Sequence, residues 1–146
     1  MLVENLRSKY CLHVVYASKS SGAAIQQDSC GLDNDAILFR VRASVTLHGD
    51  VYHQYQNVGS GLCLEPTGAS EQADAQVVQE KCASTSDYAQ FWRTDYTSGS
   101  HYELRNGHSG LCMSIAGAST AVNANVLQGT CIGAPSQTWV TAVSSQ

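Results

Sequence analysis

The sequence contains one pattern three times, and this repetition restricts the possible folds more than any other feature. Eight positions recur with identical spacing within a window of 26 residues. They are Asn5, Ser8, Cys11, Ala17, Ser18, Ala23, Gln27 and Cys30 in the first copy, Asn57, Ser60, Cys63, Ala69, Ser70, Ala75, Gln79 and Cys82 in the second, and Asn106, Ser109, Cys112, Ala118, Ser119, Ala124, Gln128 and Cys131 in the third. A unit of this length cannot bury its apolar face alone, so the copies must pack on one another.

Three copies arranged around an axis can close on themselves, whereas an open stack leaves unpaired strand edges at both ends. We therefore expect a single closed domain with pseudo-threefold symmetry. Its repeats should span approximately residues 1–48, 49–97 and 98–146. A chain of 146 residues can bury one hydrophobic core but not two independent ones.

Each repeat is expected to form four short strands, because apolar stretches alternate with turns rich in Gly, Ser, Asn and Asp. The first strand precedes the repeated Asn, the second begins at the first Cys, and the third is apolar. The fourth strands are expected to begin at residues 37–39, 90–92 and 137–139. No stretch has a sustained helical period, so we predict an all-β fold with one aromatic from each repeat, Phe39, Trp92 and Trp139, in its core.

The six cysteines occupy the same two places in every repeat, 19 residues apart. This placement fits a disulfide framework better than a zinc site, which would use short Cys-x-x-Cys hooks. The symmetry favours one bridge inside each repeat: Cys11–Cys30, Cys63–Cys82 and Cys112–Cys131. Disulfides persist in oxidising compartments, so we expect a secreted or periplasmic protein. Since no signal peptide is visible, we expect a mature or trimmed chain.

Several functional classes are disfavoured by the composition. The net charge is −4 and the eight Lys and Arg residues are scattered, which argues against nucleic acid as a partner. No apolar run reaches the roughly 20 residues of a membrane helix, so we expect no membrane insertion. The histidines lack metal-site spacing and a Gly-x-Ser-x-Gly turn is absent, so we expect no enzyme activity, no metal and no cofactor.

The repeated Asn-x-x-Ser-Gly-x-Cys-Leu, Gln-x-x-Cys and Gln-x-Trp motifs resemble those of ricin B-type lectins, and the resemblance covers the whole chain. It implies a β-trefoil, also found as a carbohydrate-binding module of bacterial glycoside hydrolases. In that family each repeat can hold a shallow pocket, often for galactose-like sugars. The resemblance implies an Asp two residues after the first Cys, an aromatic for the apolar sugar face, and an Asn beside the Gln-x-Trp motif.

This chain departs from that pattern in every repeat. The Asp position holds His13, Glu65 and Ser114, the Asn position holds Ala36, Ala89 and Ser136, and the position two before the second Cys holds Asp28, Glu80 and Gly129. In the first repeat the Gln of Gln-x-Trp is replaced by Ile37. Sugar binding must therefore be judged repeat by repeat.

The second repeat retains most of the expected chemistry. Glu65 keeps a carboxylate, and Asp87 and Tyr88 can add an acceptor and a ring. The alternative is that Glu65 is a solvated turn carboxylate and Tyr88 a partly buried loop aromatic. If Glu65 binds sugar, Glu65→Ala should abolish binding and leave folding intact.

The other two repeats offer weaker candidates. In the first, Gln26 matches a hydrogen-bonding position of the family and His13 can donate or accept, although both also fit as ordinary strand residues. In the third, Ser114, Asn123 and Asn125 could form a neutral polar pocket.

Two functions follow from these observations. The first is a secreted carbohydrate-binding module that recognises galactose-type or arabinose-type glycans weakly and multivalently. The alternative is a trefoil that has lost sugar binding and serves as an interaction or assembly subunit of a larger secreted enzyme or toxin.

Overall fold

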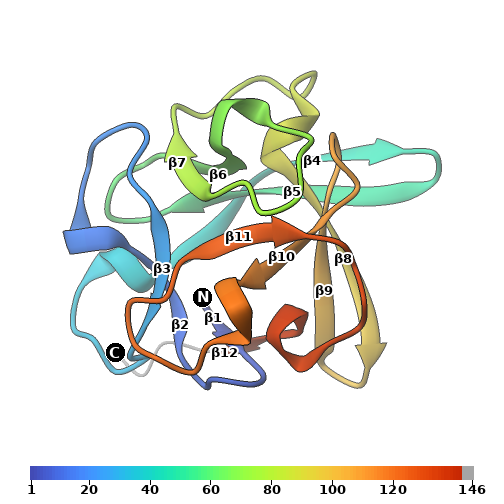
Figure 1. Cartoon of the computed structure of the whole chain (residues 1–146). Coiled ribbons are helices and arrows are strands. Elements are labelled where there is room, and N and C mark those ends of the chain that lie inside the picture. The colour runs from blue at the N-terminus through green and yellow to red at the C-terminus, as the bar shows by residue number, and fades with distance from the viewer. Residues whose placement is uncertain (143–146) are drawn as a thin grey trace.

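The computed structural model describes residues 1–142, which form twelve strands in three sets of four (Figure 1). The first set is β1 (Leu2–Asn5), β2 (Cys11–Val14), β3 (Ile25–Asp28) and β4 (Phe39–Leu47). The second is β5 (Asp50–Asn57), β6 (Cys63–Pro66), β7 (Val77–Glu80) and β8 (Phe91–Ser98). The third is β9 (His101–Asn106), β10 (Cys112–Ile115), β11 (Val126–Gly129) and β12 (Trp139–Ala142). The all-β trefoil expected from the sequence is confirmed.

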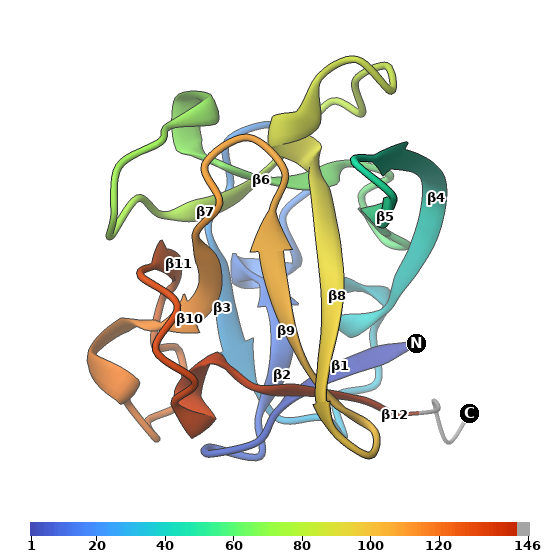
Figure 2. The same cartoon turned by 90° about the vertical axis from the view of Figure 1, so that its right-hand side faces the viewer.

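The first and fourth strands of the repeats build a barrel, and the second and third strands form hairpins beside it (Figure 2). Within a repeat β5 pairs with β8 and β9 with β12, while β4–β5 and β8–β9 join neighbouring repeats. The hairpins are β2–β3, β6–β7 and β10–β11. The two ends of the described chain meet, since β1 pairs with β12 from Leu2↔Ala142 to Asn5↔Trp139. Met1 and Phe39 exchange backbone hydrogen bonds of 2.8 and 3.0 Å, which link the start of β4 to the residue before β1.

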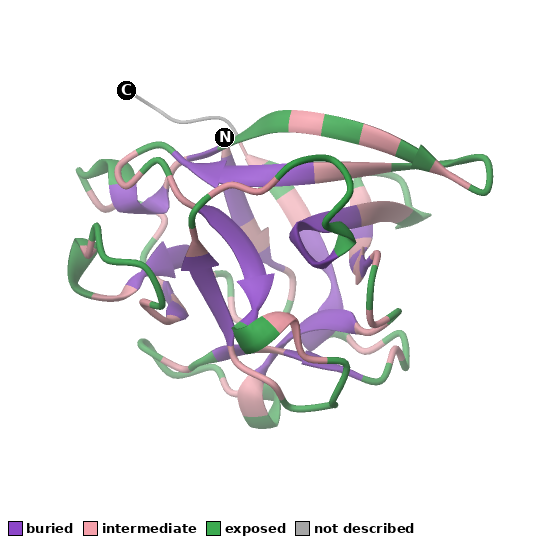
Figure 3. Cartoon of the chain, turned by 90° about the horizontal axis from the view of Figure 1, so that it is seen from above, coloured by how far each residue is buried: buried purple, intermediate pink, exposed green. Residues whose placement is uncertain are grey.

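The core lies on the barrel axis and is apolar and aromatic (Figure 3). Phe39, Trp92 and Trp139 are all fully buried in one cluster, as the repeat positions predict. The two indole N–H groups are satisfied, because Trp92 Nε1 donates to the Leu64 carbonyl at 3.2 Å and Trp139 Nε1 to the Met113 carbonyl at 3.0 Å. Each ring is thereby fixed against the hairpin of its own repeat.

The three predicted disulfides, Cys11–Cys30, Cys63–Cys82 and Cys112–Cys131, are all present. Each closes a loop of 19 residues, which the chain-entropy view values at about 3 kcal/mol. Each ties the start of a repeat's second strand to the segment that follows its third strand.

The repeated polar residues hold the repeats together. Asn57 donates to the Ala36 carbonyl, Asn106 to that of Ala89, and Asn5 to that of Ser136, so each Asn binds the preceding repeat around the ring. The repeated Gln accepts a hydrogen bond from the repeated Ser and donates to carbonyls of a neighbouring repeat, as Gln79 does to Ser18 and Ser20. These motif positions therefore serve the fold, and any ligand site must use other residues.

The fourth strands begin at Phe39, Phe91 and Trp139, within the expected ranges. The residues before them form short 3-10 turns, η2 (Asp35–Ile37), η4 (Tyr88–Gln90) and η6 (Pro135–Gln137). Asn34 and Asp87 accept hydrogen bonds from the backbone N–H two residues on, and Pro135 fixes φ at the start of η6. The turns place the third residue of each, Ile37, Gln90 or Gln137, beside the second strand of its repeat.

The second strand of each repeat is followed by a further 3-10 turn: η1 (Val15–Ala17), η3 (Thr67–Ala69) or η5 (Ala116–Ala118).

Within residues 1–142 no helix is long and apolar enough to cross a bilayer. The same residues contain no group of three or more His, Cys, Asp or Glu side chains arranged to hold a metal ion.

Candidate functional site

The position two residues after the first Cys lies in the second strand of each repeat and contacts the 3-10 turn before the fourth strand. In two repeats the Gln of that turn donates a hydrogen bond to the side chain at this position. Gln90 Nε2 donates to Glu65 Oε1 at 2.9 Å, and Gln137 Nε2 donates to Ser114 Oγ at 2.9 Å. Glu65 and Ser114 are therefore partly committed to internal hydrogen bonds.

Glu65 lies in β6 and is only 9% exposed, so its interpretation as a solvated turn carboxylate is wrong. The expectation that Glu65→Ala leaves folding intact is wrong for the same reason, because the buried Gln90 amide would lose this acceptor. The Glu65 side chain points toward Gln90 and therefore lies between the β6–β7 hairpin and η4. Burial raises the pKa of Glu65, and the nearby charges of Asp87 and Glu80 raise it further, whereas the hydrogen bond from Gln90 opposes the shift. The second repeat thus holds one buried carboxyl group, Glu65, near the half-buried Glu80 and the exposed Asp87.

Replacing Glu65 by Gln tests this environment. In the pH range between the ordinary value of 4.5 and the raised pKa, the folded chain binds more protons than the unfolded chain, so stability falls as pH rises. Glu65→Gln removes this loss and keeps an acceptor for Gln90, so its free energy of unfolding at pH 7 should equal or exceed that of the wild type by up to about 1 kcal/mol. Urea denaturation at several pH values measures the difference. The exposed Glu71→Gln is the control, and a clear loss of stability in Glu65→Gln at pH 7 would contradict the assignment.

Asp87 and Tyr88 lie at the other side of this turn. The Asp87 carboxylate accepts a hydrogen bond from the Ala89 N–H at 3.3 Å and so caps η4. Tyr88 is 37% exposed. The charge of Asp87 helps to raise the pKa of Glu65.

The first repeat differs because Ile37 stands where the other repeats have Gln. Ile37 packs against Leu2 and Cys11 and cannot donate a hydrogen bond to His13. His13 Nδ1 is buried with no hydrogen-bond partner, and it lies 4.0 Å from Asp28 Oδ2. Burial lowers the pKa of His13 more than Asp28 raises it, so the ring is neutral at neutral pH and can donate or accept.

His13 and Gln26 line a pocket of about 370 Å³. Its other lining residues are Val15, Tyr16, Asp28 and Asn123. Asn123 comes from the third repeat, and Gln26 Nε2 donates to Asn125 Oδ1 at 3.0 Å across the β3–β11 contact. Asn123 therefore lines the first-repeat pocket, and Asn125 is hydrogen-bonded to one of its residues.

Ser114 does not share this pocket lining. It is 5% exposed, donates to the Cys112 carbonyl and accepts from Gln137. The neutral third-repeat pocket expected from the sequence is thus divided between two places, because Asn123 and Asn125 flank the neighbouring repeat.

Tyr16 is the lining residue that the motif comparison missed. Its side chain is 95% exposed, and its backbone has φ of 53° in η1. Five residues after the first Cys, the other repeats have Gly68 and Gly117, with φ of 62° and 60°. A tyrosine where symmetry provides glycine was the signal available in the sequence.

Comparison with solved structures places the fold among trefoil proteins. A designed threefold-symmetric protein, ThreeFoil, matches with a TM-score of 0.85 and 29% identity over 97% of both chains. An exo-β-1,3-galactanase from Clostridium thermocellum matches with a TM-score of 0.83 and 22% identity over 95% of this chain, which spans 29% of the enzyme chain. The C-half of an earthworm R-type lectin, solved in complex with GalNAc, matches with a TM-score of 0.67 and 9% identity over 95% of this chain and 94% of that one.

No curated protein sequence matches the chain. The family model described as the ricin-type beta-trefoil lectin domain, however, matches residues 1–139, which is nearly the whole sequence. That extent agrees with the threefold motif, the disulfide in each repeat and the closed ring of strands. The chain belongs to the ricin-type β-trefoil lectin domain family.

Proposed function

We propose that this domain is a glycan-binding module and that the first-repeat pocket is its principal sugar site. The observation that carries the proposal is the pairing of a nearly fully exposed Tyr16 ring with a buried, unpartnered His13 nitrogen in one cavity. Sugar sites combine an apolar face with a few well-placed polar groups. This pocket supplies both.

The polar groups suit hydroxyl ligands. Gln26 and Asn123 offer amide donors and acceptors, and His13 offers a ring nitrogen. The Asp28 carboxylate can accept charge-assisted hydrogen bonds from sugar hydroxyls, which are the stronger kind. Asp28 thus supplies the carboxylate that the family pattern would place at His13.

The backbone at Tyr16 supports a functional role. A non-glycine residue at positive φ costs roughly 1–2 kcal/mol. The adjacent alanine of this turn has positive φ in all three repeats, so the distinctive feature of Tyr16 is that it stands where the other two repeats have glycine. Since the exposed ring contributes little to the core, folding alone does not explain a tyrosine at this position.

The proposal also covers the type of sugar, a second binding site, secretion and a partner chain. Galactose-type sugars are the first candidates, since GalNAc is the ligand of the earthworm lectin, and arabinose-type sugars are the second. Glu65, Asp87 and Tyr88 would form a weaker second-repeat site, which makes binding multivalent. Three disulfides favour secretion, and a larger enzyme or toxin chain is a suitable covalent or assembled partner.

Tyr16→Gly provides a sharp test because it separates binding from stability. The substitution removes the ring and relieves the positive φ, so the free energy of unfolding should stay equal or rise by up to about 1 kcal/mol. Affinity for methyl galactoside, lactose or arabinose should fall about tenfold or more. NMR titration at millimolar sugar measures binding, and chemical denaturation measures stability.

The matched control is Ile132→Gly, which removes an exposed apolar side chain outside the pocket lining. Wild-type affinity in Tyr16→Gly would refute the first-repeat site. If none of the sugars shifts the signals of any repeat while a protein partner does, the interaction-subunit alternative replaces glycan binding.

A further inference from the structure

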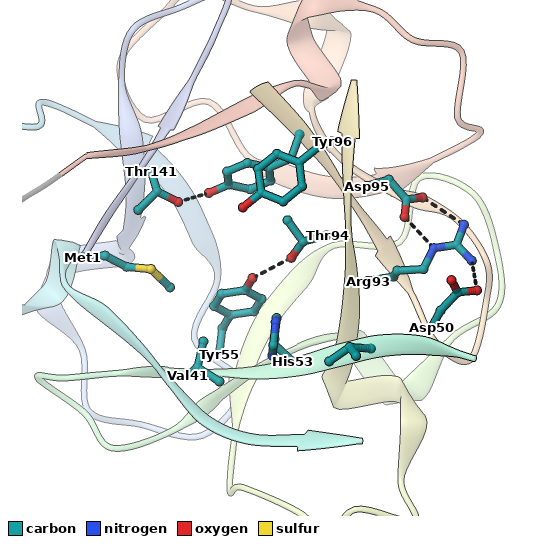
Figure 4. A pocket seen from close by; sticks show the side chains of 12 residues that line it. Met1, Val41, Asp50, His53, Tyr55, Arg93, Thr94, Asp95, Tyr96 and Thr141 are labelled. Atoms are coloured by element: carbon teal, nitrogen blue, oxygen red, sulfur yellow. Dashed lines mark hydrogen bonds and ion pairs between the residues drawn. The ribbon is translucent and has the colours of Figure 1, made fainter. Parts of the chain in front are cut away.

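We propose that the barrel carries a second, separate binding subsite for a neutral sugar ring, at its mouth between β4–β5 and β8–β9. A cavity of about 370 Å³ opens there (Figure 4). Its lining shares no residue with the first-repeat pocket. The proposal therefore stands independently of the site assigned above.

The walls of this cavity are exposed and apolar. Tyr96 is 69% exposed and meets the buried Tyr102 edge-on, with ring centroids 5.7 Å apart. Val41 and Val51 of the β4–β5 hairpin also line the cavity and are 44% and 50% exposed. Tyr102 holds the Tyr96 ring at the edge of the cavity, where its face can receive the C–H face of a pyranose.

The floor is formed by two tyrosine–threonine pairs (Figure 4). Tyr55 Oη lies 3.1 Å from Thr94 Oγ1, and Tyr102 Oη lies 2.6 Å from Thr141 Oγ1. Two hydroxyls that share one hydrogen bond retain one hydrogen and free lone pairs for a ligand. Burial raises the pKa of Tyr102 to about 12, although the hydrogen bond with Thr141 opposes the shift, so this hydroxyl keeps its proton at neutral pH.

The charges at the rim are already paired. Arg93 donates to both carboxylate oxygens of Asp95, at 2.6 and 2.8 Å, and to Asp50 at 3.2 Å. Arg105 forms a further ion pair with Asp95 at 3.5 Å. Arg105 lies outside the cavity lining, but through its ion pair with Asp95 the two arginines balance the two aspartates, so the paired charges attract neither an anion nor a cation.

These three features together define the ligand class. The exposed ring and valines suit an apolar face, the hydroxyl floor suits donors and acceptors, and the balanced rim suits a neutral molecule. A polyhydroxylated ring without charge, such as a terminal pyranose, meets all three requirements.

The test is an NMR titration of the whole domain with methyl galactopyranoside. We expect saturable shifts at residues 53–55 and 94–96, resolved from those of the first-repeat pocket at residues 13–16 and 26–28. Tyr96→Ala should weaken binding at the mouth about tenfold or more and leave the first-repeat shifts unchanged. Thr94→Val keeps the shape, removes one floor hydroxyl and should also weaken binding, whereas Ile132→Ala should have no effect.

Each proposal can fail alone because the two sets of signals are read separately. Shifts confined to the first-repeat pocket would overturn the mouth subsite and keep the proposed function. Shifts confined to the mouth would refute the first-repeat site and keep the mouth subsite. Tetrahydropyran, a ring without hydroxyls, should not bind at the mouth, and equal affinity for it would show an apolar cavity in place of a sugar subsite.

Discussion

A chain in which Trp92 is replaced by Ala should lose about 3–5 kcal/mol of its free energy of unfolding. The indole is fully buried in the cluster that joins the three repeats, and its Nε1 donates to the Leu64 carbonyl. Truncation therefore creates a cavity on the barrel axis and leaves a buried carbonyl without its donor. Chemical denaturation followed by circular dichroism measures the loss, and Trp139 remains as the fluorescent reporter.

Two further variants serve as comparison and control for Trp92→Ala. Trp92→Phe should cost less than Trp92→Ala, because first-repeat Phe39 shows that a phenyl ring fits the equivalent position. Ile132→Ala should change stability by less than about 0.5 kcal/mol, since the side chain is 74% exposed. A loss below about 1 kcal/mol for Trp92→Ala would contradict the axial core.

Gln90→Ile should lose about 3 kcal/mol, because several buried polar groups lose their partner together. Gln90 Nε2 donates to Glu65 and to the Lys81 carbonyl, both at 2.9 Å. Gln90 Oε1 accepts from Gln54 Nε2 and from the Ala83 N–H, both at 2.7 Å. The side chain thus joins β5, β6 and the segment after β7.

Ile37 occupies the same position in the first repeat, where its surroundings, including Leu2, Leu32 and Leu38, are apolar. The cost of Gln90→Ile therefore comes from the polar surroundings of Gln90 and not from the turn itself. Gln137→Ile should behave similarly, since Gln137 also serves Ser114, Thr130 and Ile132, while the exposed Gln72→Ile is the control. Denaturation midpoints equal to wild type in both buried variants would refute this role.

The fold could be predicted because the main inter-repeat contacts occur in all three repeats. Asn5, Asn57 and Asn106 make the same hydrogen bond to the preceding repeat, and Phe39, Trp92 and Trp139 fill equivalent places. When one repeat has a different residue at such a position, the other two repeats still show the repeated pattern. The exact start of the fourth strands was less predictable, because local turn contacts at Asn34, Asp87 and Pro135 set it.

The candidate site was harder to predict because it depends on departures from the repeat. Asn123 belongs to the third repeat in sequence, yet it lies beside His13 and Tyr16. Contacts between β3 and the segment that leads into β11 bring them together, including the hydrogen bond from the Asn123 N–H to the Gln27 carbonyl at 2.8 Å. The exposure of Glu65 was misjudged for a related reason. Its burial depends on contact with Gln90, which is distant in sequence.

The shared pocket has a consequence for biosynthesis. Gln26 and Asn125, which bond to each other across β3 and β11, are 99 residues apart, so the N-terminal part of the pocket leaves the ribosome long before its partner. Domains fold as units once enough chain has emerged. A nascent or truncated chain without the third repeat would carry Tyr16 and His13 but no completed cavity, so the sugar site proposed here would form only when the third repeat has been synthesised.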